Sequence, residues 1–347
     1  MEGNMKVAVM PEMRKIEFTE RPIPKPGKDE VLVKLEYVGI CGSDLHYYES
    51  GRIGDFVVES PLVLGHEAGG TVVEVGADVT HLKVGDRVAL EPGKTCGTCE
   101  FCRSGRYNLC PEVVFFATPP VDGVFQEYVA HEAALCFKIP DNMDTMEAAL
   151  IEPLAVGFHA ARQGNAHIGQ TAVVMGSGCI GLMSLLALKS MGLSEVYVVD
   201  VMPKRLDKAM ELGASAVING SKQDTVEEIE RLTEGHGVDL VIETAGSEIT
   251  TKQSITICKP GATIVLVGYP PEGEISFPVS VALNKELDIK TVFRYRHIYP
   301  MAIEAVASGR ANVKGVVTNV FDFDDLKNAL EMSLEDKSNI VKSVVRI

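Results

Sequence analysis

The chain has 347 residues, enough for about two domains at roughly 150 residues each. A hydrophobic fraction of 46% and a charged fraction of 23% are typical of globular proteins and exclude a disordered or fibrous chain. The net charge of −15 gives a surface that repels phosphate backbones and anionic lipid, so we expect neither a nucleic-acid nor a membrane partner. The first ten residues lack the pattern of a signal peptide, which favours a cytoplasmic location.

The first part of the chain predicts a mainly β domain. From Lys6 to about Pro140, short β-type runs are separated by glycine and proline. The clearest runs are Val31–Leu35, Gly70–Val75 and Asp86–Leu90. The loops between such strands are where functional side chains are expected.

From Gln170 the pattern changes to alternating strands and helices, which predicts an α/β domain with a doubly wound, six-stranded parallel sheet. Helices are predicted after the first strand, to about Met191, and from Pro203 to Gly213, and Lys259–Gly261 is predicted as a turn. The tail from Pro300 predicts a helix and then a β-like segment at 315–318. The six predicted strands are 171–175, 195–200, a strand at Val217, 238–244, 263–268 and 288–295.

One uncharged stretch, Ile168–Leu188, is long enough to span a bilayer. Four glycines and three polar side chains interrupt it, so a buried strand, turn and helix explain it better than a membrane helix.

The sequence Gly176-Ser177-Gly178-Cys179-Ile180-Gly181 matches the G-x-G-x-x-G dinucleotide fingerprint. Its glycines permit a tight turn, close approach of a pyrophosphate and packing of helix on strand. Asp200 ends the next predicted strand, 200 − 181 = 19 residues on, where a carboxylate binds the ribose 2′-hydroxyl and repels a 2′-phosphate. NAD is therefore expected, while nearby Arg205 leaves NADP open; the alternative is a glycine-rich turn with a chance acid.

Four of the eight cysteines, Cys96, Cys99, Cys102 and Cys110, lie within fifteen residues. In a large chain without an export signal, this clustering indicates metal rather than disulfides. Four thiolates on one loop suit tetrahedral Zn²⁺ without an open position, which is a structural site. An iron–sulfur cluster or a chance group of free thiols remains as an alternative.

A second constellation combines Cys41, which follows a β run, with His66 and Glu67. A cysteine, a histidine and a carboxylate with an open fourth position are the donors that catalytic Zn²⁺ requires. The alternative is a buried cysteine beside a hydrogen-bonded core histidine.

Together these motifs resemble the zinc-dependent medium-chain alcohol dehydrogenases, and within them the polyol (sorbitol/xylitol) dehydrogenase branch, over essentially the whole chain. The stretches that carry the resemblance are Cys41–Tyr48, Gly51–Gly54, Gly65–Glu67, Phe116–Pro120, Ile151–Leu154 and Val292–Tyr295.

The resemblance implies a GroES-like catalytic domain, residues 1–153 and 296–347, and a Rossmann domain, residues 154–295, with the active site in the cleft between them. It also implies a homotetramer, with a homodimer as the alternative.

The resemblance implies that Cys41, His66 and Glu67 hold the catalytic zinc, with Glu152 as a ligand directly or through water. Glu67 as a residue that only orients His66 remains open. Ser43 and His46 match the family's proton relay, in which the hydroxyl takes the alcohol proton and passes it outward through the cofactor ribose.

Substrate contacts are implied for Tyr47, Arg294 and Tyr295, with an inter-domain salt bridge as the alternative for Arg294. Further cofactor contacts are expected at Ile180, Gly268 and Phe293.

The expected reaction is the reversible oxidation of a secondary alcohol of a polyol, of sorbitol, xylitol or iditol type, to its ketose with NAD. A sister dehydrogenase acting on threonine, butanediol or another secondary alcohol is the close alternative. A nucleotide-binding structural or regulatory protein with a dead site is the alternative from another class.

Overall fold

A computed structural model describes residues 2–270 and 273–347 and divides the chain into two compact units. The first unit comprises Met1–Glu152, Tyr299–Ala307 and Val317–Ile347, and the second comprises Pro153–Ile298 and Ser308–Val316. The sequence analysis expected a change of domain after residue 153, and the first unit ends at Glu152. It expected residues 296–347 in the first unit, whereas 296–298 and 308–316 group with the second.

The first unit is built on a seven-stranded sheet in the order β11-β7-β6-β3-β19-β18, with β10 also paired to β3. Two of the β runs recognised in the sequence lie within β3 and β6 of this sheet, and the third, Asp86–Leu90, begins one residue before β7. Most residues of β3 are buried, and the strand is paired on both edges. The strands are β3 (Glu30–Gly39), β6 (Glu67–Val75), β7 (Arg87–Leu90), β10 (Tyr128–Glu132), β11 (Cys136–Lys138), β18 (Asn319–Asp322) and β19 (Ser343–Arg346).

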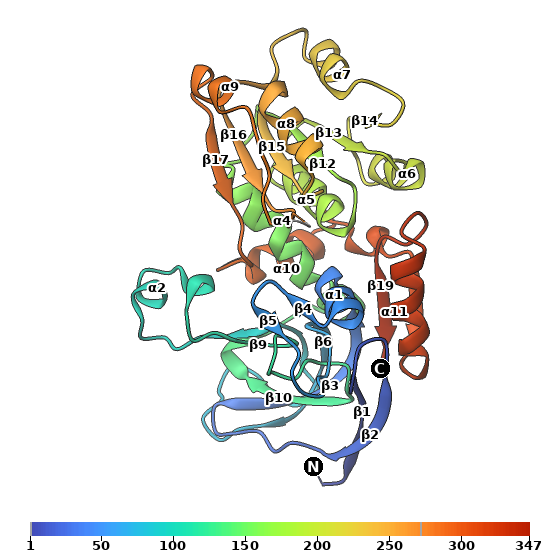
Figure 1. The fold of residues 1–347 in the computed structure, drawn as a ribbon. Coiled ribbons are helices and arrows are strands. Elements are labelled where there is room, and N and C mark those ends of the chain that lie inside the picture. The colour runs from blue at the N-terminus through green and yellow to red at the C-terminus, as the bar shows by residue number, and fades with distance from the viewer. Residues whose placement is uncertain (1, 271–272) are drawn as a thin grey trace. The chain divides into compact units, whose positions relative to one another are not determined.

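The C-terminal part of the chain completes this sheet. Strand β19 pairs antiparallel with β3, and β18 pairs parallel with β19, so the red strand β19 lies in the same unit as the blue N-terminal strands (Figure 1). The predicted β-like segment at 315–318 is wrong: Val313–Val316 forms a 3₁₀ turn, and the strand begins at Asn319.

The remaining strands of the first unit form short antiparallel pairs, and short helices connect them. The pairs are β1 (Asn4–Val9) with β2 (Glu17–Pro22), β4 (Arg52–Ile53) with β5 (Phe56–Val57) and β8 (Gly93–Lys94) with β9 (Val114–Phe115). The helices are α1 (Gly42–Ser50), α2 (Glu100–Arg103), α3 (Thr145–Ala149), α10 (Tyr299–Ala307) and α11 (Leu326–Glu335), with 3₁₀ turns at Tyr107–Leu109, Ala133–Leu135 and Phe323–Asp325.

The second unit contains the predicted six-stranded parallel sheet, in the order β14-β13-β12-β15-β16-β17. This order reverses at β12, the first strand, which is the doubly wound arrangement in which ligands bind at the carboxyl ends of the strands. The strands are β12 (Thr171–Met175), β13 (Glu195–Asp200), β14 (Ala216–Asn219), β15 (Val238–Glu243), β16 (Cys258–Leu266) and β17 (Asp288–Thr291).

Two strands differ from prediction. The predicted strand 288–295 ends at Thr291, and Arg294 beyond it has φ 55°, a left-handed conformation that an extended strand excludes. The predicted turn Lys259–Gly261 lies inside β16, where Gly261 has φ 76° and the pairing register with β15 shifts. The turn residues therefore form an irregularity in the strand.

Helices α4 (Ile151–Gln163), α5 (Cys179–Ser190), α6 (Pro203–Glu211), α7 (Thr225–Leu232), α8 (Glu248–Ile257) and α9 (Val279–Asn284) complete the second unit, and α4 begins in the last residues of the first. The uncharged stretch 168–188 is divided between β12 and α5, as predicted. Within the described residues, no helix has the length and apolarity needed to cross a membrane.

Candidate active site

The structure brings the predicted catalytic ligands together. One donor atom each from Cys41, His66 and Glu67 lies within 4.8 Å of the other two. The antiparallel pairing of β3 with β6 explains this, because Gly39 near the end of β3 lies opposite Glu67 at the start of β6. A Cβ atom at Gly39 would lie 1.9 Å from Glu67 Oε2, so only glycine leaves room for that carboxylate.

Asp44 supports this group, and the sequence analysis did not single it out. Its buried carboxylate accepts hydrogen bonds from the backbone N–H of Cys41 and of Gly65, both at 2.9 Å. Its Oδ1 also lies 3.6 Å from Nδ1 of His66. Asp44 therefore joins the two loops that carry Cys41 and His66 and orients the imidazole. Its position as an acid three residues after the N-cap of α1 was the available sequence signal.

The electrostatics of the site suit a cation. Burial lowers the pKa of His66, but the charges of Asp44 and Cys41 raise it, and together they hold it well above its usual value. The site therefore attracts positive charge strongly enough to overcome desolvation of the imidazole. One thiolate, one imidazole and one carboxylate are zinc donors, so these residues fit the metal that the sequence predicted.

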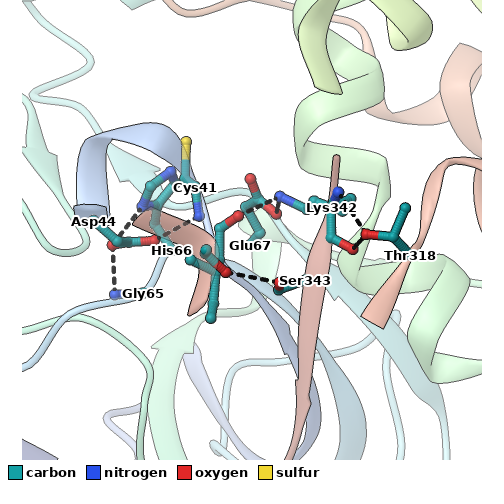
Figure 2. Close-up of polar contacts among 10 residues, drawn as sticks. Cys41, Asp44, Gly65, His66, Glu67, Thr318, Lys342 and Ser343 are labelled. Atoms are coloured by element: carbon teal, nitrogen blue, oxygen red, sulfur yellow. Dashed lines mark hydrogen bonds and ion pairs between the residues drawn. The ribbon is translucent and has the colours of Figure 1, made fainter. Parts of the chain in front are cut away.

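Lys342 is a second residue that the sequence analysis missed. Its ammonium forms an ion pair with Oε2 of Glu67 and donates a hydrogen bond of 2.9 Å to the carbonyl of Ile40 (Figure 2). Both side chains of the ion pair are only 1% exposed. Thr318 fixes the backbone at this point, because its N–H and its hydroxyl both donate to the carbonyl of Lys342. Glu67 therefore faces the ammonium of Lys342 as well as the metal site.

The other predicted residues of the first unit have different environments. Ser43 and His46 lie on α1, three residues apart and so on one helix face, with His46 exposed; within the described residues no hydrogen bond joins them directly. Tyr47 is buried at 4% exposure and packs in the core of the first unit. Glu152 is also buried but is not a member of the Cys41–His66–Glu67 group.

The four clustered cysteines also converge, with their sulfurs within 4.8 Å of one another. The Sγ of Cys96 lies 3.6 Å from that of Cys110 and 4.0 Å from that of Cys102. Four sulfurs bound tetrahedrally at about 2.3 Å are separated by roughly 3.8 Å, so the spacing suits zinc. Backbone N–H groups of Thr98 and Cys99 lower the pKa of Cys96 to about 6, which favours the thiolate that binds metal.

Glu91 anchors this cysteine loop to the sheet of the first unit. Its carboxylate accepts a hydrogen bond of 2.7 Å from the hydroxyl of Tyr107, within the loop, and its carbonyl lies 2.8 Å from Nε2 of His131. Burial raises the pKa of Glu91 to about 7, although the Tyr107 hydrogen bond lowers it.

The glycine fingerprint lies between β12 and α5, as predicted. Gly176 has φ 91°, and a Cβ at Gly181 would lie 1.9 Å from the carbonyl oxygen of Gly176. The turn thus requires glycine at both positions and leaves the N-terminus of α5, beginning after Gly178, open to an anion. These residues fit the pyrophosphate of a dinucleotide, and half-buried Ile180 lies in the first turn of α5.

Asp200 and Arg205 both lie beside this turn. Asp200 ends β13 and accepts hydrogen bonds from the backbone N–H of Ser177 at 2.6 Å and of Val201 at 2.7 Å. A Cβ at Gly178 would lie 3.7 Å from Nη1 of Arg205, so that guanidinium also reaches the loop. The carboxylate and the guanidinium are thus both placed to influence cofactor choice.

The remaining predicted residues belong to the second unit. Phe293 is 50% exposed, Arg294 is half-buried with its guanidinium 4.9 Å from the Phe293 ring centroid, and Tyr295 is buried. Gly268 accepts no side chain, because a Cβ there would lie 2.2 Å from the backbone nitrogen of Gly246.

Comparisons with known proteins agree with this arrangement. A family model described as the alcohol dehydrogenase GroES-like domain matches residues 27–141, and one described as zinc-binding dehydrogenase matches residues 179–308. A sorbitol dehydrogenase of Bacillus subtilis (strain 168) is 45% identical over 342 residues, which cover 99% of this chain and 97% of that protein.

Two solved structures add to this. The 2R,3R-butanediol dehydrogenase from Bacillus subtilis has a TM-score of 0.90 and 34% identity, with 99% of each chain covered. A proposed zinc-binding dehydrogenase from Sinorhizobium meliloti 1021, bound to NADP, has a TM-score of 0.89 and 31% identity, covering 99% of this chain and 100% of that one. Zinc and a nicotinamide cofactor therefore belong to the chemistry of this fold. On these similarities, the chain belongs to the zinc-dependent medium-chain alcohol dehydrogenase family.

Proposed function

We propose that this enzyme interconverts a polyol of the sorbitol, xylitol or iditol type and its ketose by hydride transfer to and from NAD. The observation that carries the proposal is the convergence of Cys41, His66 and Glu67, a donor set with one carboxylate and a single thiolate. The similarity to a sorbitol dehydrogenase over nearly the whole of both chains supports a polyol as the substrate.

In this proposal Cys41, His66 and Glu67 hold the catalytic zinc, and Glu152 approaches it directly or through water. Bound zinc supplies a Lewis acid for the alcohol oxygen. Asp44 keeps the His66 ring in place, since its carboxylate lies 3.6 Å from Nδ1. Lys342 draws Glu67 toward β19 and so opposes its approach to the metal.

Ser43 accepts the proton of the substrate hydroxyl, and exposed His46 exchanges it with solvent. Bound NAD⁺ supplies the hydride acceptor. The absence of a direct hydrogen bond between Ser43 and His46 within the described residues is compatible with a relay that passes through the cofactor ribose. Tyr47, Arg294 and Tyr295 are proposed to contact the polyol.

Two finer points are part of the proposal. The convergence of four cysteines supports a second, structural zinc in each chain. The position of Asp200 at the end of β13, beside the glycine turn, supports NAD over NADP, with Ile180, Gly268 and Phe293 as further cofactor contacts.

We also propose a homotetramer in the cytoplasm. Exposed Val279 and Leu283 on α9 and Ile289 on the edge strand β17 support self-association. Eight free cysteines suit a reducing compartment. Light scattering of the purified protein tests the oligomer. The acidic surface gives no support for a nucleic-acid or membrane partner.

A diol dehydrogenase is the second candidate, because a butanediol dehydrogenase has the same fold over both full chains. Initial rates with sorbitol, xylitol, iditol, galactitol, threonine and 2,3-butanediol, each with NAD⁺ and with NADP⁺, separate the candidates. The proposal expects the highest kcat/KM with a polyol and NAD⁺. A preference for butanediol or threonine contradicts the substrate, equal efficiency with NADP⁺ contradicts the role of Asp200, and no turnover at all contradicts an enzyme.

A further inference from the structure

The segment from Val292 to His297 carries three of the residues assigned to cofactor and substrate, yet it has no regular secondary structure. Arg294 and His297 have φ angles of 55° and 50°, in the left-handed region that side chains other than glycine rarely adopt. Such a backbone persists only where surrounding contacts hold it in place. The contacts that hold this segment therefore decide where Arg294 and Tyr295 point.

Three of those contacts come from the last turn of α4. The guanidinium of Arg162 donates to the carbonyl of Arg296 at 2.5 Å and to the carbonyl of His297 at 3.5 Å. The neighbouring Gln163 donates from Nε2 to the carbonyl of Thr291 at 3.2 Å. Two consecutive side chains of one helix thus hold both ends of the segment.

A buried histidine fixes Arg162 in turn. Nη2 of Arg162 lies 3.0 Å from Nδ1 of His159, and because a guanidinium is only a donor, that nitrogen is the acceptor of a neutral imidazole. Burial, and then the charges of Arg162 and Arg296, lower the pKa of His159 to about 4, so the imidazole is neutral at physiological pH. His159 is 1% exposed, and α4 is a thirteen-residue helix, so the guanidinium has a rigid base.

We propose that Arg162 is a positioning residue for substrate specificity, which holds segment 292–297 so that Arg294 and Tyr295 meet the polyol hydroxyls away from the reacting carbon. This inference rests on the proposed polyol function. A planar guanidinium holds five N–H donors in a rigid fork, whereas an ammonium offers three rotatable donors at a single point on a flexible stem, so arginine and lysine differ here. A secondary alcohol without further hydroxyls gains nothing from Arg294. Its turnover therefore does not depend on how Arg162 holds segment 292–297.

The test compares Arg162→Met and Arg162→Lys with wild type at saturating NAD⁺. For Arg162→Met we expect KM for sorbitol to rise at least tenfold, with kcat/KM for 2-butanol within threefold of wild type. Arg162→Lys should recover part of the sorbitol KM. Arg231→Met is the matched control, because Arg231 forms an exposed ion pair with Glu228 within α7, and it should change none of these values.

Equal losses with sorbitol and 2-butanol, or an unchanged sorbitol KM, would overturn the inference. If Arg162→Met does not fold, a rise of threefold or more in the sorbitol KM of Arg162→Lys supports the proposal, and a smaller one overturns it. Should wild type oxidise no polyol, the proposed function fails by itself. The role of Arg162 in holding the segment is then tested by amide hydrogen exchange in residues 292–297. Exchange must be faster in the Arg162 variants than in Arg231→Met.

Discussion

The Glu67 carboxylate lies between two positive charges, the metal expected at Cys41 and His66 and the ammonium of Lys342. Burying a charge costs free energy, and in a buried ion pair the attraction between the partners offsets that cost. Removing one partner therefore leaves an uncompensated buried charge, which destabilises the fold. In this site a bound metal replaces the missing partner. The contribution of Lys342 to stability should therefore depend on zinc.

Replacing Lys342 by methionine should lower the free energy of unfolding of the metal-free protein by about 3–5 kcal/mol, because the Glu67 charge loses its partner. The loss should be smaller in the zinc-loaded protein, and zinc should bind more tightly than in wild type. Urea unfolding with and without chelator, and zinc titration against a competing chelator, measure these effects. Lys15→Met, which breaks an exposed pair with Glu17, is the control and should change the free energy of unfolding little. Equal losses of stability with and without zinc would contradict a competition between Lys342 and zinc for Glu67.

Replacing Ser43 by alanine should remove a proton-transfer step, and such steps contribute roughly 10²–10⁴-fold to rate. The loss should appear in kcat as well as kcat/KM, because the step acts in the transition state. Zinc content and NADH affinity serve as controls and should stay at the wild-type level. His46→Ala should be milder, because exposed His46 is accessible to buffer that can replace it. A kcat near wild type in Ser43→Ala would leave Ser43 with only a structural role.

At the residue scale the sequence grouped Cys41, His66 and Glu67 as candidate metal donors, which the structure brings together, but it did not identify the groups that hold them. Cys41 and His66 stand in recognisable spacing, whereas Lys342 is 342 − 67 = 275 positions from Glu67. A lone lysine in the apolar run 340–345 does indicate a buried partner, but sequence alone names none. Which groups compensate a buried charge depends on strand pairing across the fold, here β19 with β3.

At the scale of elements, the apolar runs of the parallel sheet were predictable because strands covered on both faces need continuous apolar sequence. Their ends were harder to predict. The segment 288–295 is rich in the β-branched and aromatic residues typical of strands, yet Arg294 adopts a left-handed conformation and the strand ends at Thr291. Contacts from α4 hold that conformation, and no local pattern in the segment encodes them.

The anchor of the cysteine loop gives a pH dependence. The carboxyl of Glu91 keeps its proton up to about pH 7 in the folded protein but only to about 4.5 when unfolded, so the folded state binds more protons between these values. Wild-type stability should therefore fall as pH rises through this window. Glu91→Gln lacks this titration, so its stability relative to wild type should rise by about 2–3 kcal/mol between pH 4.5 and 8.

Urea unfolding of both proteins at pH 4.5, 6 and 8 measures this difference. Parallel stability profiles across the three pH values would show that Glu91 titrates normally.

At the scale of the whole molecule, the length of the chain indicates about two domains, and the family resemblance supplied the expected boundaries. In the tail, residues 308–316 group with the second unit, and Val313–Val316 among them forms a short 3₁₀ turn that has no periodicity to reveal it in the sequence. The cysteine group was predictable from its close spacing, whereas Cys41 lies 66 − 41 = 25 positions before His66 and that group was expected mainly from the family resemblance. The structure places both groups in the first unit.

Purified protein should therefore contain two zinc ions per chain, and Cys99→Ser should contain one. The variant should be less stable, because a structural ion contributes directly to folding, while the Cys41, His66 and Glu67 donors stay in place. Elemental analysis counts the metal, and thermal unfolding gives the loss of stability. One zinc or none in wild type, or two in Cys99→Ser, would count against separate sites.

The pairing of β19 with β3 also orders events during synthesis. Cys41, His66 and Glu67 emerge from the ribosome long before Lys342 is added to the chain. The growing chain therefore presents these metal donors before the ammonium that pairs with Glu67 has been synthesised. Zinc captured at that stage meets an unpaired Glu67 carboxylate. Zinc added to the finished, metal-free protein must instead displace an ammonium that already occupies it. Metal loading should accordingly be faster during translation than after it.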